Sequence, residues 1–229
     1  MDFNKADFGL RWGLISKRET IPLGGSAVEF GSGTGRNVVA MAKYIPGAIG
    51  YDLSPHLIAG AKKRISEAGV NAQVVYGNAW DVEIKKGSLA VASVDMLIYL
   101  PKGRARKMLK KVWQGLKPNG LLHVVFAMPD DNSHLDEFFE FTLAPFPEEK
   151  EQFSYYHSCG GFYGMCEHQA EGVEGASFWT RRQAFGALRQ LGPFSFVFAQ
   201  RTAWWQNNVY SDGTERLRRA FYRVTVQKK

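Results

Sequence analysis

Three glycines alternate with other residues in the stretch 31–35, and an acid, Glu29, stands shortly before them. Glycine lets the backbone adopt dihedral angles that other residues avoid, and it lets a ligand approach the main chain closely. A second acid, Asp52, ends the apolar run 48–51. A carboxylate at the end of a strand is suited to accept hydrogen bonds from ribose hydroxyls. The spacing therefore indicates a site for a polar ligand that carries a ribose.

These residues require a strand, a tight turn and a helix in succession. Residues 27–30 form a short apolar run, and apolar side chains recur at helical spacing after the glycines. The helix N-terminus would offer unpaired N–H groups to the ligand. The dinucleotide fingerprint has the spacing G-x-G-x-x-G, whereas Arg36 stands here where its third glycine would fall. The usual pyrophosphate-binding form is therefore not indicated.

Glu29, the glycines of residues 31–35 and Asp52 together resemble the class I S-adenosylmethionine-dependent methyltransferases, of the small-molecule type. The resemblance covers residues 27–126 and resumes near residue 178. It implies an α/β fold with a Rossmann-like seven-stranded sheet, helices on both faces and the last strand antiparallel. It also implies S-adenosyl-L-methionine as the cofactor, with the turn beneath its methionine part and Asp52 on its ribose. A strand–turn–helix unit without a ligand is the alternative.

The same resemblance assigns further residues to the cofactor. Asn78 stands where the family meets the adenine amino group, and the next backbone N–H reaches the ring. Trp80 either stacks on adenine or belongs to the core, and Asp95 either orients the methionine end or caps a strand. An N-terminal helix over residues 4–17 either closes over the cofactor or only packs on the body. The predicted cofactor contacts are Glu29, Gly31, Ser32, Gly33, Gly35, Asp52, Leu53, Asn78, Ala79, Trp80, Asp95, Arg11 and Trp12.

Capping signals predict where several elements begin and end. Ser54 is a predicted N-cap before a helix that stops at Gly69. Asn119 is expected to adopt the left-handed conformation in the turn before the fifth strand. The fourth strand is predicted over residues 93–98, with Tyr99 near its carboxyl end, where open α/β sheets perform their chemistry.

Residues 104–116 have the pattern of an amphipathic helix with an outward basic face that includes Lys111. Such a face is usually solvated, and binding of nucleic acid is the less favoured alternative.

Residues 127–176 differ sharply in charge from the rest of the chain. They carry a net charge of −10, whereas the remainder carries +17 and the whole chain +7. Acids and aromatic rings together suit the binding of a cation, and they equally describe an amphipathic lid. The chain is therefore predicted to be one domain, residues 1–229, in which residues 127–176 form a substrate lid inserted after the fifth strand.

Four residues of this insertion have a spacing that a metal site would allow. They are His157, Cys159, Cys166 and His168. On a hairpin they would share one face, but the spacing matches no standard zinc pattern. Ordinary packing or contact with a substrate is favoured, and no metal is predicted.

The implied reaction moves a methyl group from the sulfonium to a small-molecule acceptor by in-line displacement. An amine needs little help, whereas a hydroxyl acceptor needs a general base. The candidate bases are His157, His168, Tyr99 and Tyr155. An RNA methyltransferase that uses the basic body and a non-catalytic partner subunit are the alternatives.

Composition narrows the setting of the protein. No apolar run approaches the roughly 20 residues that a membrane span needs, and only two cysteines occur in the chain. No disulfide framework is indicated, so a cytoplasmic location is expected.

Overall fold

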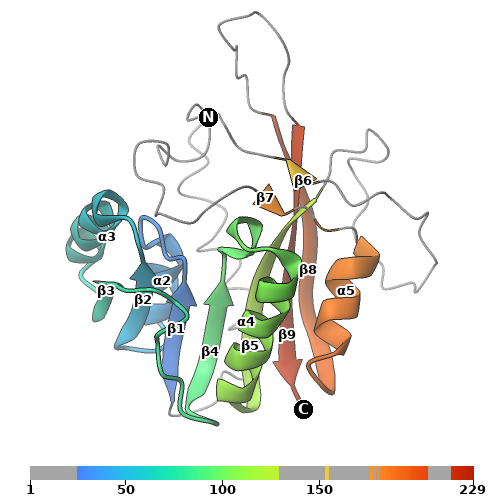
Figure 1. Ribbon diagram of the computed structural model, residues 1–229. Helices are drawn as coiled ribbons and strands as arrows, with labels where there is room; N and C mark the ends of the chain where they lie inside the picture. The colour runs from blue at the N-terminus through green and yellow to red at the C-terminus, as the bar shows by residue number, and fades with distance from the viewer. Residues whose placement is uncertain (1–24, 129–152, 155–175, 178, 180, 206–217) are drawn as a thin grey trace, which may run out of the picture.

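The structure is a computed structural model that describes residues 25–128, 153–154, 176–177, 179, 181–205 and 218–229. Seven strands form one sheet in the order β3-β2-β1-β4-β5-β9-β8, and β9 runs antiparallel to both of its neighbours (Figure 1). The strands are β1 Ser26–Phe30, β2 Ala48–Asp52, β3 Ala72–Tyr76, β4 Leu89–Val94, β5 Leu116–Met128, β8 Phe194–Trp205 and β9 Arg218–Lys228. Two short strands, β6 Phe153–Ser154 and β7 Ala176–Ser177, pair separately.

Helices cover both faces of the sheet, which confirms the predicted Rossmann-like arrangement with an antiparallel last strand. The helices are α2 Arg36–Ala42, α3 Pro55–Ala68, the 3₁₀ helix η1 Leu97–Tyr99, α4 Lys102–Gly115 and α5 Arg181–Arg189. Side chains alternate along β1, so Ala27 packs with α2 and α3, whereas Val28 and Phe30 pack with α4 and α5. Each face of the sheet therefore has its own apolar core.

The capping signals of the sequence are confirmed. The Ser54 hydroxyl accepts a hydrogen bond from the Leu57 N–H at 3.3 Å, and α3 ends at Gly69 with φ 60°. Asn119 is the described non-glycine residue with positive φ, at 62°. Short polar side chains form these caps locally, so neighbouring residues were enough to predict them.

The predicted boundaries around the fourth strand were wrong. β4 begins at Leu89 and ends at Val94, and Tyr99 lies in η1 rather than at the end of a strand. All six residues of β4 are buried. A strand that is buried on both faces shows no alternation of polar and apolar residues, so its limits cannot be read from periodicity.

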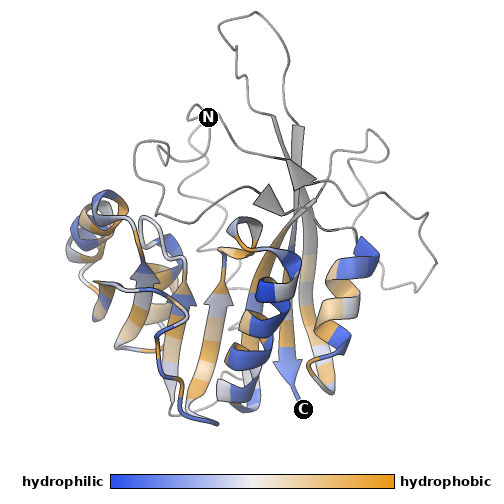
Figure 2. Cartoon of the chain, in the orientation of Figure 1, coloured by the Kyte–Doolittle hydropathy of each residue, from blue (hydrophilic) through white to orange (hydrophobic). Residues whose placement is uncertain are grey.

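Helix α4 is bonded to other elements at its beginning, middle and end. Its first residue, Lys102, is buried and donates from Nζ to Gln183 Oε1 of α5 at 2.9 Å. Near its end, Lys228 Nζ of β9 donates to Trp113 O and Leu116 O at 2.9 and 2.6 Å. Figure 2 shows the hydrophilic outer side of this helix in front of the apolar strands. None of the described helices is both long enough and apolar enough to span a membrane.

Candidate functional site

The glycine turn lies between the carboxyl ends of β1 and β2 and is hydrogen-bonded to β2. The N–H groups of Gly31 and Ser32 both donate to Tyr51 O, at 2.9 and 3.1 Å. The next N–H, that of Gly33, donates to Asp52 Oδ2 at 2.7 Å. Three consecutive N–H groups of the turn therefore point toward the end of β2.

Asp52 joins the turn to the start of α3. Its Oδ1 accepts the Ser54 N–H at 2.9 Å, while Oδ2 accepts the Gly33 N–H. Each carboxylate oxygen has two lone pairs, so each can accept one more hydrogen bond. The half-exposed carboxylate can therefore fix the turn and bind hydroxyl groups at the same time. The predicted contact with ribose stays a prediction.

The glycines of the turn differ in what surrounds them. A Cβ on Gly31 would lie 2.6 Å from the Met96 Cβ, and the residue has φ +76°. A Cβ on Gly33, at φ +50°, would meet no atom within 4 Å. Gly31 is therefore required by packing and backbone conformation together. Gly33 instead leaves open space directly against the main chain.

Beneath the turn, Glu29 is a buried acid with one unbonded oxygen. The side chain is 1% exposed, and its Oε1 accepts a hydrogen bond from Asn37 Nδ2 at 2.6 Å. Its Oε2 accepts none from the residues that the structure describes. Burial, and secondly the negative charge of Asp95, raise the pKa of Glu29 well above its ordinary value. The sequence analysis missed Asn37, because its role follows from tertiary packing.

Asp95 adds a second carboxyl group beside Glu29. Strands β1 and β4 are paired with Glu29 opposite Ser93, and the Asp95 N–H donates to Phe30 O at 3.2 Å. Burial raises the pKa of Asp95 to about 6, against the opposing effects of Arg223 and then Arg36. Glu29 is buried and Asp95 is half-buried, and the two carboxyl groups form an acidic pair that favours a nearby cation.

The loop after β3 carries the residues predicted to meet adenine. Its first residue, Gly77, donates its N–H to Asp52 O at 3.0 Å, which places the loop beside the end of β2. Asn78 Oδ1 accepts the Trp80 N–H at 3.0 Å. Trp80 is half-buried and packs against the core that contains α4 and α5. This position fits the core reading, and stacking on adenine stays a prediction.

Lys111 does not follow the prediction that it points outward. Its Nζ donates to Ala79 O at 3.3 Å and to Trp80 O, and the side chain is half-buried. The long alkyl chain lets the ammonium bend toward backbone carbonyls that periodicity cannot reveal. A residue of α4 is therefore bonded to the loop that carries Asn78.

Several predicted site residues cannot be placed. Seven residues of the catalytic, metal and cofactor sets considered above lie outside the described residues: Arg11, Trp12, Tyr155, His157, Cys159, Cys166 and His168. Tyr99 is half-buried in η1, and Leu53 is half-buried after Asp52. Within the described ranges, no cluster of three or more His, Cys, Asp or Glu residues could hold a metal ion.

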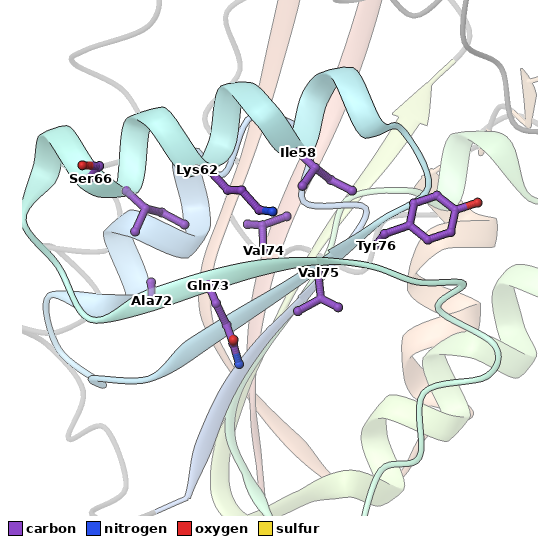
Figure 3. A pocket seen from close by; sticks show the side chains of 9 residues that line it. Ile58, Lys62, Ser66, Ala72, Gln73, Val74, Val75 and Tyr76 are labelled. Carbon is purple, nitrogen blue, oxygen red and sulfur yellow. The ribbon is translucent and has the colours of Figure 1, made fainter.

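A cavity of about 510 Å³ lies between α3 and the edge strand β3 (Figure 3). None of the predicted site residues lines it, although Tyr76 at its rim is 65% exposed. It is lined by Ile58, Lys62, Ile65, Ser66, Ala72, Gln73, Val74, Val75 and Tyr76. The cavity is therefore separate from the site formed by the glycine turn and Asp52.

Comparison with known proteins relates this arrangement to a family. Residues 27–120, which include the turn, Asp52, the Asn78 loop and Asp95, match the model of a methyltransferase domain. The sheet order and the antiparallel last strand agree with the same fold. Over residues 27–120 the chain is therefore similar to a methyltransferase domain, and its sheet has the fold of the S-adenosylmethionine-dependent methyltransferases.

One curated protein similar to this chain is the carboxy-S-adenosyl-L-methionine synthase of Colwellia psychrerythraea. The two are 27% identical over 115 residues, which are 48% of this chain and 47% of the relative. The chain therefore spans about half the length of that relative.

Solved structures share the fold at low identity. YcgJ from Bacillus subtilis has a TM-score of 0.61 at 12% identity, over 95% of this chain and 97% of that one. TehB from Haemophilus influenzae has a TM-score of 0.59 at 13% identity, over 95% and 62% of the two chains. The magnesium protoporphyrin IX methyltransferase ChlM from Synechocystis PCC 6803, with bound SAM, has a TM-score of 0.58 at 12% identity, over 96% of this chain and 77% of that one. These likenesses show the fold.

Proposed function

We propose that this protein is a methyltransferase that transfers the methyl group of S-adenosyl-L-methionine to a small-molecule acceptor, either an amine or an aromatic or hydroxyl nucleophile. The observation that carries the proposal is the open space over Gly33 beside the Asp52 carboxylate. This place lies at the carboxyl ends of β1 and β2, beside the point where the strand order reverses between β1 and β4. Open α/β sheets bind their ligands at such points.

The described residues fit the cofactor chemically. Asp52 retains lone pairs for ribose hydroxyls, and Asn78 lies on the adjacent loop. The acidic pair Glu29 and Asp95, with the unbonded Glu29 Oε2, suits the ammonium of the methionine part. The cofactor supplies an electrophilic methyl group on its sulfonium. The protein has to hold that methyl group in line with the acceptor and exclude water.

Charge supports a small acceptor over a nucleic acid. Residues 127–176 carry a net charge of −10, and as the predicted substrate lid they would repel a polyanion. The basic face of α4 is partly engaged, because Lys111 binds loop carbonyls and the Arg106 guanidinium lies 5.5 Å from the centre of the Trp179 ring. ChlM, which shares the fold, is named for a porphyrin substrate. Tyr99 and the candidate bases of residues 127–176 stay predictions, as does a cytoplasmic location.

Calorimetry with S-adenosylhomocysteine tests the proposal first. We expect a micromolar dissociation constant, followed by transfer of a labelled methyl group to members of a panel of amines, phenols and thiols. Failure to bind this nucleoside would contradict the proposal and favour a non-catalytic partner subunit. Methylation of tRNA or rRNA fragments that weakens steeply with salt, without transfer to small molecules, would favour the RNA enzyme.

A further inference from the structure

We propose that Lys111 is a positioning residue that fixes how Asn78 presents its amide to the adenine of the cofactor. The inference rests on the proposed function, because it concerns the same nucleoside site. It depends on one peptide group, that between Ala79 and Trp80, which is held at both ends. Its carbonyl, Ala79 O, accepts from Lys111 Nζ at 3.3 Å, and its N–H donates to Asn78 Oδ1 at 3.0 Å.

The ammonium of Lys111 acts on this peptide in two ways. It also binds the next carbonyl, Trp80 O, so both carbonyls of the loop are directed toward α4. A carbonyl that binds a cation polarises its own peptide group, which strengthens the hydrogen bond that the N–H donates. The Trp80 N–H therefore holds the amide oxygen of Asn78 in place. The amide cannot exchange the positions of its oxygen and nitrogen without losing this bond.

The fixed orientation has a consequence for recognition of the base. Asn78 Oδ1 retains one lone pair that can accept a hydrogen bond from the 6-amino group of adenine. A purine with a carbonyl at that position, hypoxanthine, would place an acceptor against an acceptor. Without Lys111 the peptide can rotate, and Asn78 can turn its NH₂ group toward such a carbonyl. Lys111 thus controls discrimination between the two bases without touching either.

The test compares S-adenosylhomocysteine with S-inosylhomocysteine by calorimetry. The wild-type protein should bind the adenosyl compound roughly tenfold or more tightly, since an unpaired acceptor is costly. Lys111→Met should lower that preference to roughly equal binding, mainly through lost affinity for the adenosyl compound. Lys111→Arg, which keeps charged donors, should restore most of the preference. Lys110→Met is the matched control, because Lys110 is the exposed neighbour on the same helix.

A second measurement separates positioning from a loss of structure. In an Asn78→Ala background, Lys111→Met should change the ratio of the two dissociation constants no further, because the residue through which it acts is gone. If Met at 111 prevents folding, Lys111→Gln provides the comparison with a shorter donor.

The outcomes distinguish failure of the Lys111 proposal from failure of the proposed function. An unchanged ratio in Lys111→Met, with both compounds still bound, would overturn the role of Lys111. Equal binding of the two compounds by the wild-type protein would do the same and leave the methyltransferase proposal intact. Failure of the wild-type protein to bind either compound would overturn both proposals.

Discussion

Carboxyl groups lie near the ends of neighbouring strands in two settings that differ in hydrogen bonding, and Glu29 is also far more buried than Asp52. Asp52, after β2, is half-exposed, and each of its oxygens accepts a backbone N–H. Glu29 lies on β1 and Asp95 follows β4, and burial raises the pKa of both. Glu29 Oε2 accepts no hydrogen bond from a described residue. The comparison teaches that a position at the end of a strand does not determine the environment of a carboxyl group. The number of N–H donors around the group and its access to water determine that environment.

The largest effect is expected at the well-bonded carboxylate. Asp52→Ala should lower the affinity for S-adenosylhomocysteine roughly 100-fold, because both the ligand and the Gly33 N–H lose a charged acceptor. Asp52→Asn keeps one acceptor oxygen, so its affinity for S-adenosylhomocysteine should lie between those of Asp52→Ala and the wild-type protein. Calorimetry gives the dissociation constants, and Glu67→Ala on the exposed side of α3 is the control. Unchanged binding by Asp52→Ala would show that the site reading is wrong.

The acidic pair of Glu29 and Asp95 is expected to make the free energy of unfolding depend on pH. The folded state holds a proton on Asp95 up to a pH of about 6, whereas the unfolded chain releases it near the ordinary value of 3.8. The wild-type protein therefore loses stability as the pH rises from about 4 to 6, and the loss is constant above that range. Asp95→Asn removes this loss and should raise the free energy of unfolding at pH 8 by about 2 kcal/mol. Urea unfolding at pH 4.5 and pH 8 measures it. If the stability gained by Asp95→Asn does not grow between pH 4.5 and pH 8, the raised pKa of Asp95 is contradicted.

Glu29 offers a second test of the same environment. Glu29→Gln keeps an acceptor for Asn37 and has the shape of the protonated acid. Because burial favours the neutral form of Glu29, we expect Glu29→Gln to raise the free energy of unfolding at pH 8 and to lose this advantage in acid. Chemical denaturation at both pH values measures the change. Destabilisation at pH 8 would mean that the folded protein needs a charged Glu29.

The smallest expected effect is on the pH dependence of ligand affinity, through the acidic pair of Glu29 and Asp95. An α-ammonium near Glu29 and Asp95 favours their ionised forms, so binding must displace a proton below a pH of about 6. The affinity for S-adenosylhomocysteine should therefore rise about threefold between pH 5.5 and pH 7.5. Calorimetry across this range should show the rise in wild type and a flatter profile in Asp95→Asn. If affinity depends on pH equally in wild type and Asp95→Asn, Asp95 does not interact with the ammonium of the ligand.

Local chemistry made much of the fold and part of the site predictable. The strand–turn–helix unit, the Ser54 cap and the left-handed Asn119 depend on residues close in sequence. Asp52 could likewise be placed because it ends a strand that the glycine turn precedes.

The parts that were missed depend on partners distant in sequence. Lys111 lies 31 residues from Trp80, and its direction follows from the packing of α4 against the loop. Glu29 and Asp95 become neighbours through the pairing of β1 with β4. The limits of β4 were hidden because its residues are buried on both faces.

The three attachments of α4 also bear on how the molecule opens. Lys102 joins the helix to α5, Lys111 joins it to the loop after β3, and Lys228 joins its end to β9. A helix braced in this way exchanges its amide hydrogens only when several elements separate together. Slow exchange along α4, with faster exchange in α3, would mark it as the rigid partner during any fluctuation that admits or releases a ligand.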